Sequence, residues 1–225
     1  CILGHNDPWV KRAQIHYLQS EQPSFHSTRY GSEIYYSIPA RMAELNVANV
    51  ENPRICHRQC NGSDVVELAL ISAYKQRGNK SLALSISGSY HGQNWTAFSV
   101  SCQQTQNRFL QDTESVVFLG EKTNSGSDFE TSVLNEFRQY ADRAFAIIIE
   151  PIQVNNGTRR FSRGFFRKLR TLCTELDVCL IFDEIQTCFG WLGTYSAAEK
   201  YDVSPDISLM SKALTAGNGP LSVMI

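Results

Sequence analysis

The sequence lacks an excess of charge of either sign. Its 225 residues include 21 lysines and arginines against 22 aspartates and glutamates, which gives a net charge of −1. Surfaces that bind nucleic acid or anionic membranes carry a clear excess of basic residues, so the composition predicts neither partner. With 42% hydrophobic and 19% charged residues, the chain also lacks the composition of a disordered protein.

Long apolar segments are missing too. Runs such as 144–149 and 178–182 are far shorter than the about 20 residues that cross a bilayer. The first residues include His5, Asp7 and Lys11, where a secretion signal would have an apolar segment. We therefore expect no membrane association and a cytoplasmic protein, with the mitochondrion as the alternative compartment.

Cysteine pairs at metal-binding spacing are absent. Seven cysteines are scattered along the chain without a CxxC motif, and several of them interrupt apolar runs. A structural zinc site needs closer pairs, whereas isolated cysteines in apolar runs behave as small hydrophobic side chains. The pattern predicts free thiols in a reducing compartment and no metal site.

The remaining pattern alternates short apolar runs with amphipathic segments. Fully apolar strands between amphipathic helices are typical of a parallel sheet with helices on both faces, an α/β fold. The polar stretches 103–128 and 154–164 are expected to be loops. The predicted strands are 81–86, 144–149, 178–182, 207–210 and 221–225; the predicted helices are 64–77, 129–141 and 165–176.

Three ionisable residues follow apolar runs. Glu150, Asp183 and Lys212 each come at or just after the end of a predicted strand. Ligands of parallel sheets bind at the carboxyl ends of the strands, so these side chains are expected to meet there. Alone, Asp183 could cap a helix, and Lys212 could be a solvated helix residue. A magnesium-binding nucleotidase is not supported, because the sequence lacks the G-x-x-x-x-G-K-[ST] loop.

Two earlier motifs could complete such a site. Gly62 and Ser63 open a predicted helix, where free N–H groups suit a phosphate, although an ordinary helix cap is the simpler interpretation. Tyr90, followed by His91 and Gly92, could present an aromatic ring to a flat ligand.

Together, and in this order, the motifs resemble the class III aminotransferases, the ornithine and 4-aminobutyrate group of fold type I pyridoxal phosphate enzymes. The similarity extends over nearly the whole chain and is strongest from 147 to 225. It is carried by Glu150-Pro151-Ile152-Gln153, by Asp183-Glu184-Ile185-Gln186-Thr187, and by the segment from Pro205-Asp206-Ile207 to Lys212.

The resemblance implies pyridoxal phosphate as the cofactor, with Lys212 as the Schiff-base lysine and Asp183 as the partner of the ring nitrogen. Both would be catalytic. The resemblance implies further contacts: Gly62 and Ser63 to the phosphate, Tyr90, His91 and Gln186 to the ring, and Glu150 near the substrate.

The implied protein is a homodimeric aminotransferase that moves an amino group from an amine or amino acid to a keto acid. Residues 1–50 would form an N-terminal helical segment and 51–225 the cofactor-binding large domain, and the small C-terminal domain of the family would be absent. Other class III reactions, such as those of aminomutases, racemases and decarboxylases, share these motifs. A non-catalytic, truncated homologue is a further alternative, since Trp191 stands where the family usually has an arginine.

Overall fold

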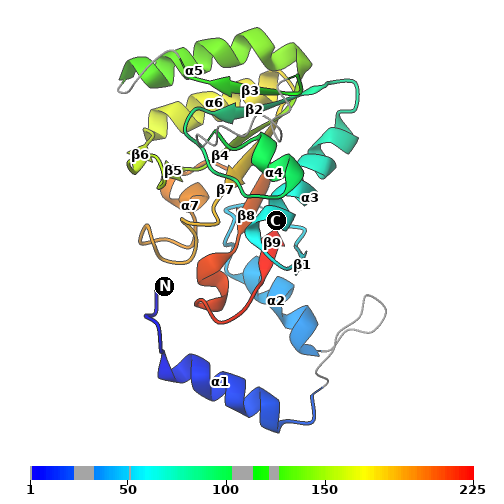
Figure 1. Ribbon diagram of the computed structural model, residues 1–225, viewed down its shortest axis with the longest axis vertical. Helices are drawn as coiled ribbons and strands as arrows, with labels where there is room; N and C mark the ends of the chain where they lie inside the picture. Colours follow the sequence, from blue (N-terminus) through cyan, green and yellow to red (C-terminus); the bar gives the residue numbers. More distant parts are fainter. Residues whose placement is uncertain (1, 23–32, 51, 103–113, 122–126) are drawn as a thin grey trace.

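A seven-stranded sheet forms the centre of the protein (Figure 1). The computed structural model describes residues 2–22, 33–50, 52–102, 114–121 and 127–225. The strand order is β1-β9-β8-β7-β4-β2-β3. The strands are β1 (Cys56–Gln59), β2 (Leu82–Ile86), β3 (Val116–Leu119), β4 (Ala144–Ile149), β7 (Cys179–Asp183), β8 (Ile207–Met210) and β9 (Ser222–Met224).

The sheet is mainly parallel, as the sequence predicts. Five neighbouring strands, from β8 to β3, run in one direction, whereas β9 pairs antiparallel with both β8 and β1. Every residue of β2, β4, β7 and β8 is buried. The continuous apolar runs follow from this burial, because both faces of these strands pack against other elements.

Helices cover both faces of the sheet. On one face, α5 (Ser127–Tyr140) and α6 (Arg163–Glu175) share an apolar core with β2, β4 and β7. On the other face, α3 (Gly62–Gln76) and α4 (Trp95–Ser99) pack against the same central strands. In α6 the residues Phe165, Leu169 and Leu172 are buried at helical spacing, which confirms the amphipathic helix predicted at 165–176.

The N-terminal part contains two helices, α1 (Pro8–Gln19) and α2 (Glu33–Glu44). Met42 and Val47, in and just after α2, join a third apolar cluster with β8 and β9, whereas α1 has no buried residue. In Figure 1, α1 lies below the rest of the molecule. The division into a segment 1–50 and a large domain 51–225 remains a prediction.

The two polar stretches contain strands that the sequence analysis did not predict. Strand β3 lies within 103–128, and β6 (Arg159–Arg160) lies within 154–164, where it pairs with β5 (Ile152–Gln153). Averaging over a polar stretch hides an apolar run of four residues, and a two-residue strand has no detectable period. Most of 103–128, namely 103–113 and 122–126, lies outside the described residues.

The described residues also contain three further short helical elements: η2 (Ala141–Arg143), α7 (Ala197–Tyr201) and η3 (Lys212–Thr215). Within the described residues, no helix combines the length and the hydropathy needed to cross a membrane.

Candidate active site

The carboxyl ends of three adjacent strands bring the predicted ionisable residues together. Glu150 follows β4, Asp183 ends β7, and Lys212 follows β8 after one residue. Because β4, β7 and β8 are neighbours and parallel, the three side chains emerge at the same edge of the sheet. All three line one cavity of about 260 Å³.

The N-terminus of α3 forms another wall of this cavity. Asn61 is the N-cap, and its side-chain and backbone oxygens accept hydrogen bonds from Asp64 N and Val65 N. The N–H groups of Gly62 and Ser63 have no acceptor within the helix. An added Cβ at Gly62 would lie 2.9 Å from Ile185 Cδ1, so the glycine lets Ile185 pack against the helix start. Two N–H donors at a helix N-terminus suit an anion.

The turn that contains Tyr90, His91 and Gly92 is attached to the same helix. Gln93 N donates to Ser63 Oγ at 3.1 Å, and Asn94 Nδ2 donates to Asp64 Oδ1 at 2.7 Å. Gly92 has φ +137°, and a Cβ there would lie 2.4 Å from Ser63 Oγ. This close approach requires glycine. The aromatic turn and the anion-binding turn therefore form one connected wall.

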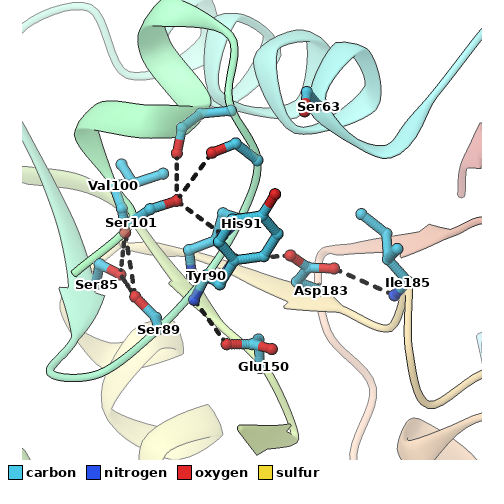
Figure 2. Close-up of polar contacts among 12 residues, drawn as sticks. Ser63, Ser85, Ser89, Tyr90, His91, Val100, Ser101, Glu150, Asp183 and Ile185 are labelled. Carbon is cyan, nitrogen blue, oxygen red and sulfur yellow. Dashed lines mark hydrogen bonds and ion pairs between the residues drawn. The ribbon is translucent and has the colours of Figure 1, made fainter. Parts of the chain in front are cut away.

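Asp183 has hydrogen-bond donors for both carboxylate oxygens (Figure 2). His91 Nδ1 lies 2.7 Å from Asp183 Oδ2, and Ile185 N donates to Oδ1 at 3.1 Å. The side chains of His91 and Asp183 are 0% and 4% exposed. A fixed, buried carboxylate in a cavity favours a cationic ligand atom.

Lys212 sits at a sharp change of chain direction. Its φ is +39°, in the left-handed region, where a non-glycine residue costs about 1–2 kcal/mol. Partial burial lowers the pKa of Lys212 from its ordinary value, and Asp183 and Glu150 oppose that shift. A lowered pKa increases the fraction of neutral amine, which is the nucleophilic form.

Glu150 contacts the aromatic turn directly. Its Oε1 accepts a hydrogen bond from Tyr90 N at 2.8 Å. Burial raises the pKa of Glu150 to about 7, and His91, the Tyr90 N–H and Lys212 reduce the shift. The carboxylate thus holds the backbone of Tyr90 while it faces the cavity.

The cavity brings together all eight site residues that the sequence analysis selected: Gly62, Ser63, Tyr90, His91, Glu150, Asp183, Gln186 and Lys212. It is also lined by Asn61, Gly92, Ile185 and Ser211, which were not selected. Gly92 and Ile185 lie within motifs already quoted, and the position of Asn61 directly before the predicted helix was the available signal for a cap. Nothing in the sequence assigns a site role to Ile185 or separates Ser211 from ordinary core residues.

These groups fit a flat, phosphorylated, nitrogen-containing carbonyl compound. The helix N-terminus suits the phosphate, Asp183 suits a protonated ring nitrogen, and Lys212 offers an amine to a carbonyl. Within the described residues, no group of three or more histidine, cysteine, aspartate or glutamate side chains could hold a metal ion.

Comparison with solved structures places this fold among transaminases. The chain superimposes with a TM-score of 0.85 on an omega-transferase from Vibrio fluvialis JS17, at 20% identity, over 98% of this chain and 55% of that one. A taurine:2-oxoglutarate aminotransferase from Bifidobacterium kashiwanohense, in complex with PLP and glutamate, matches with a TM-score of 0.81 at 24% identity, over 99% of this chain and 52% of that one. The ornithine aminotransferase from Toxoplasma gondii matches with a TM-score of 0.81 at 25% identity, over 99% and 50%.

The fold of this chain is therefore that of these transaminase structures. The family model for class-III aminotransferases matches residues 1–225, so the chain belongs to the class-III aminotransferase family. The chain spans about half the length of the solved structures it matches.

Proposed function

We propose that this chain is the cofactor-binding part of a pyridoxal phosphate-dependent aminotransferase. The observation that carries the proposal is the convergence of Lys212, Asp183 and the N-terminus of α3 on one cavity. When bound, pyridoxal phosphate supplies a carbonyl that takes up amines and a ring that accepts an electron pair from the substrate carbon.

Each residue of the cavity would contact a different part of the cofactor, according to its position. The N–H groups of Gly62 and Ser63 bind the phosphate. Asp183, held by His91 and Ile185, keeps a proton on the ring nitrogen. Tyr90 would cover the ring face, with His91 beside it, and the side-chain amide of Gln186 would donate a hydrogen bond to the ring oxygen.

Lys212 and Glu150 would act on the substrate side of the cavity. Lys212 Nζ is the amine that would bond to the carbonyl carbon of the cofactor. Once an incoming amine takes its place, Lys212 Nζ would be free to act as base and acid, moving a proton between the donor carbon and the cofactor carbon. Its lowered pKa suits both the nucleophile and the base. Glu150 faces the substrate while it fixes the Tyr90 backbone.

We further propose an amine or amino acid donor, a keto-acid acceptor, a homodimeric assembly and a cytoplasmic location. The name of the taurine:2-oxoglutarate aminotransferase includes a keto acid, 2-oxoglutarate, which supports the proposal of a keto-acid acceptor. The six cysteines within the described residues are free, which supports a reducing compartment.

Borohydride trapping tests the site. We expect reduction in the presence of pyridoxal phosphate to leave a pyridoxyl group on the peptide that contains Lys212. The adduct should vanish in Lys212→Met and persist in Lys168→Met, a matched change of an exposed lysine on α6. An adduct elsewhere in the wild-type chain, with Lys212 unmodified, contradicts the assignment.

The reaction is tested separately by keto-acid-dependent transfer of an amino group. Racemisation, a 1,2-shift or decarboxylation without transfer would favour another class III reaction. A folded chain that stays colourless with pyridoxal phosphate would favour a non-catalytic homologue. Trp191, which raised that alternative, is 57% exposed and is not among the residues that line the cavity, so it leaves the cofactor contacts intact.

A further inference from the structure

Behind the cavity, the backbone of His91 is held by a buried hydroxyl. His91 N donates to Ser101 Oγ at 2.8 Å, and Ser101 is 3% exposed (Figure 2). Ser101 lies just after α4 and does not line the cavity. It therefore contacts a site residue without being able to contact the ligand.

The Ser101 hydroxyl has a defined direction. It donates to Ala97 O at 2.8 Å, while Gly92 O lies at 3.4 Å. A hydroxyl has one proton to donate, and it forms its hydrogen bond with the nearer carbonyl, that of Ala97. A lone pair of Ser101 Oγ is then left for the His91 N–H.

The segment around Ser101 is anchored on the central sheet. Ser85 Oγ, at the end of β2, donates to Val100 O at 2.7 Å, and Ser89 Oγ lies 2.8 Å from Ser85 Oγ. Cys102 N donates to Ser89 O at 2.9 Å. Because both neighbours of Ser101 are fixed in this way, its hydroxyl is a rigid acceptor.

The ring of His91 depends on this anchor. Its Nδ1 contacts Asp183 Oδ2, and its Nε2 is buried and has no hydrogen-bond partner in the described part of the chain. No second polar contact of the ring can hold it if the His91 backbone moves. A small rotation at His91 would therefore lengthen the Nδ1 to Oδ2 contact.

We propose that Ser101 is a positioning residue, whose hydroxyl fixes the His91 backbone so that Nδ1–H donates to Asp183. This role rests on the proposed function, in which Asp183 holds a proton on the ring nitrogen of the cofactor. The predicted chain of contacts runs from the end of β2 through Ser101 and His91 to the carboxylate.

The first test needs no cofactor. In ¹⁵N-histidine NMR of the full chain, the Nδ1–H of His91 should give a resolved signal, assigned through His91→Gln among the five histidines. We expect Ser101→Ala to broaden or remove this signal by faster exchange. Ser101→Thr keeps the hydroxyl and should restore it.

Ser89→Ala is the matched control, because it removes a buried hydroxyl that does not touch His91 or Ser101. It leaves in place the two bonds that fix the neighbours of Ser101, from Ser85 Oγ to Val100 O and from Cys102 N to the backbone carbonyl of Ser89. The Ser89→Ala variant should retain the Nδ1–H signal of His91, even if its free energy of unfolding falls as much as that of Ser101→Ala. If Ser101→Ala does not fold, Ser101→Cys replaces it, since a thiol is a weaker acceptor and should weaken the signal. An unchanged His91 signal in a folded Ala or Cys variant overturns the proposal.

The second test measures pyridoxal phosphate binding by absorbance titration. Loss of one hydrogen bond behind the site should weaken binding about fivefold in Ser101→Ala and leave Ser89→Ala unchanged. Equal weakening in both variants would indicate a merely structural role and overturn the proposal. If the wild-type chain binds no pyridoxal phosphate, the proposed function fails, while the NMR comparison still decides whether Ser101 positions His91.

Discussion

At the scale of single residues, the two carboxylates of the cavity differ in their partners. Asp183 accepts hydrogen bonds on both oxygens, whereas for Glu150 only Oε1 has a contact in the described structure, from Tyr90 N. Fewer donors leave burial as the dominant effect on Glu150, and burial favours the neutral acid. Asp183 thus presents both oxygens as hydrogen-bond acceptors, whereas Glu150, with a pKa of about 7, can gain or lose a proton near neutral pH.

Glu150 should make the stability of the protein depend on pH. Its pKa is about 7 in the fold against an ordinary 4.5, so the folded chain binds a proton that the unfolded chain has lost between these values. The free energy of unfolding should therefore fall as the pH rises from about 4.5 to 7, by at most about 3 kcal/mol, and stay level above.

In Glu150→Gln this fall should shrink, since the amide keeps an oxygen for Tyr90 N but cannot titrate. Urea unfolding at several pH values measures it, with Glu175→Gln, a change of an exposed carboxylate on α6, as the control. A wild-type stability that rises across this window would contradict the assignment.

The sequence predicted site residues where chemistry marks them, and missed those that act through shape or support. A lysine or a carboxylate that follows an apolar run can be recognised in the sequence, as with Lys212 and Asp183. Ile185 packs against Gly62, and Ser101 binds a backbone N–H. Neither role has a residue type or spacing of its own, because both depend on segments that meet only in the fold.

At the scale of elements, the C-terminal end of α6 is tied to the start of β2. Lys80 Nζ donates to Leu176 O and Asp177 O, both at 2.8 Å, just beyond the last turn of the helix. Arg77 Nε adds a bond to Asp177 Oδ1 at 2.9 Å. Cations at this end also complement the helix dipole.

Lys80→Met should therefore lower the free energy of unfolding by about 1–3 kcal/mol, since charged hydrogen bonds to carbonyls are lost. Urea denaturation measures the change. Lys75→Met, at an exposed position of α3, is the control and should stay within about 0.5 kcal/mol of wild type. Equal effects of the two substitutions would mean that Lys80 does not fasten α6.

Long elements with a clear period were predictable, and short ones were not. The runs at β4 and β7 and the stripe on α6 agree with the structure within a few residues. In contrast, β3 depends on pairing with β2, a strand far from it in the sequence, which local composition does not encode. Strands β5 and β6 pair with each other, but each has only two residues, too few to show a period.

At the scale of the whole molecule, burial is unevenly distributed. The central strands are fully covered, but α1 exposes Trp9 (74%), Ile15 (53%) and Leu18 (82%). The N-terminus of α1 is stabilised locally, because Asp7 is the N-cap and Pro8 occupies the first helical position. An isolated helix of 12 residues is nevertheless marginal in water without packing.

Amides of α1 should exchange with deuterium far faster than those of β4 and β7, with α6 as a protected helical control. Hydrogen exchange followed by mass spectrometry measures this difference. Protection of α1 that grows with protein concentration would support the proposed homodimer. Protection equal to that of β4 at every concentration would contradict the prediction.

The antiparallel strand β9 lies between β8 and β1, and these two neighbours lead directly to Lys212 and to the N-terminus of α3. The two ends of the cavity therefore share one three-stranded frame, while β3 borders the opposite edge of the sheet. A change in the position of β9 would therefore move both of these walls of the cavity, whereas β3 contributes no residue to the cavity lining.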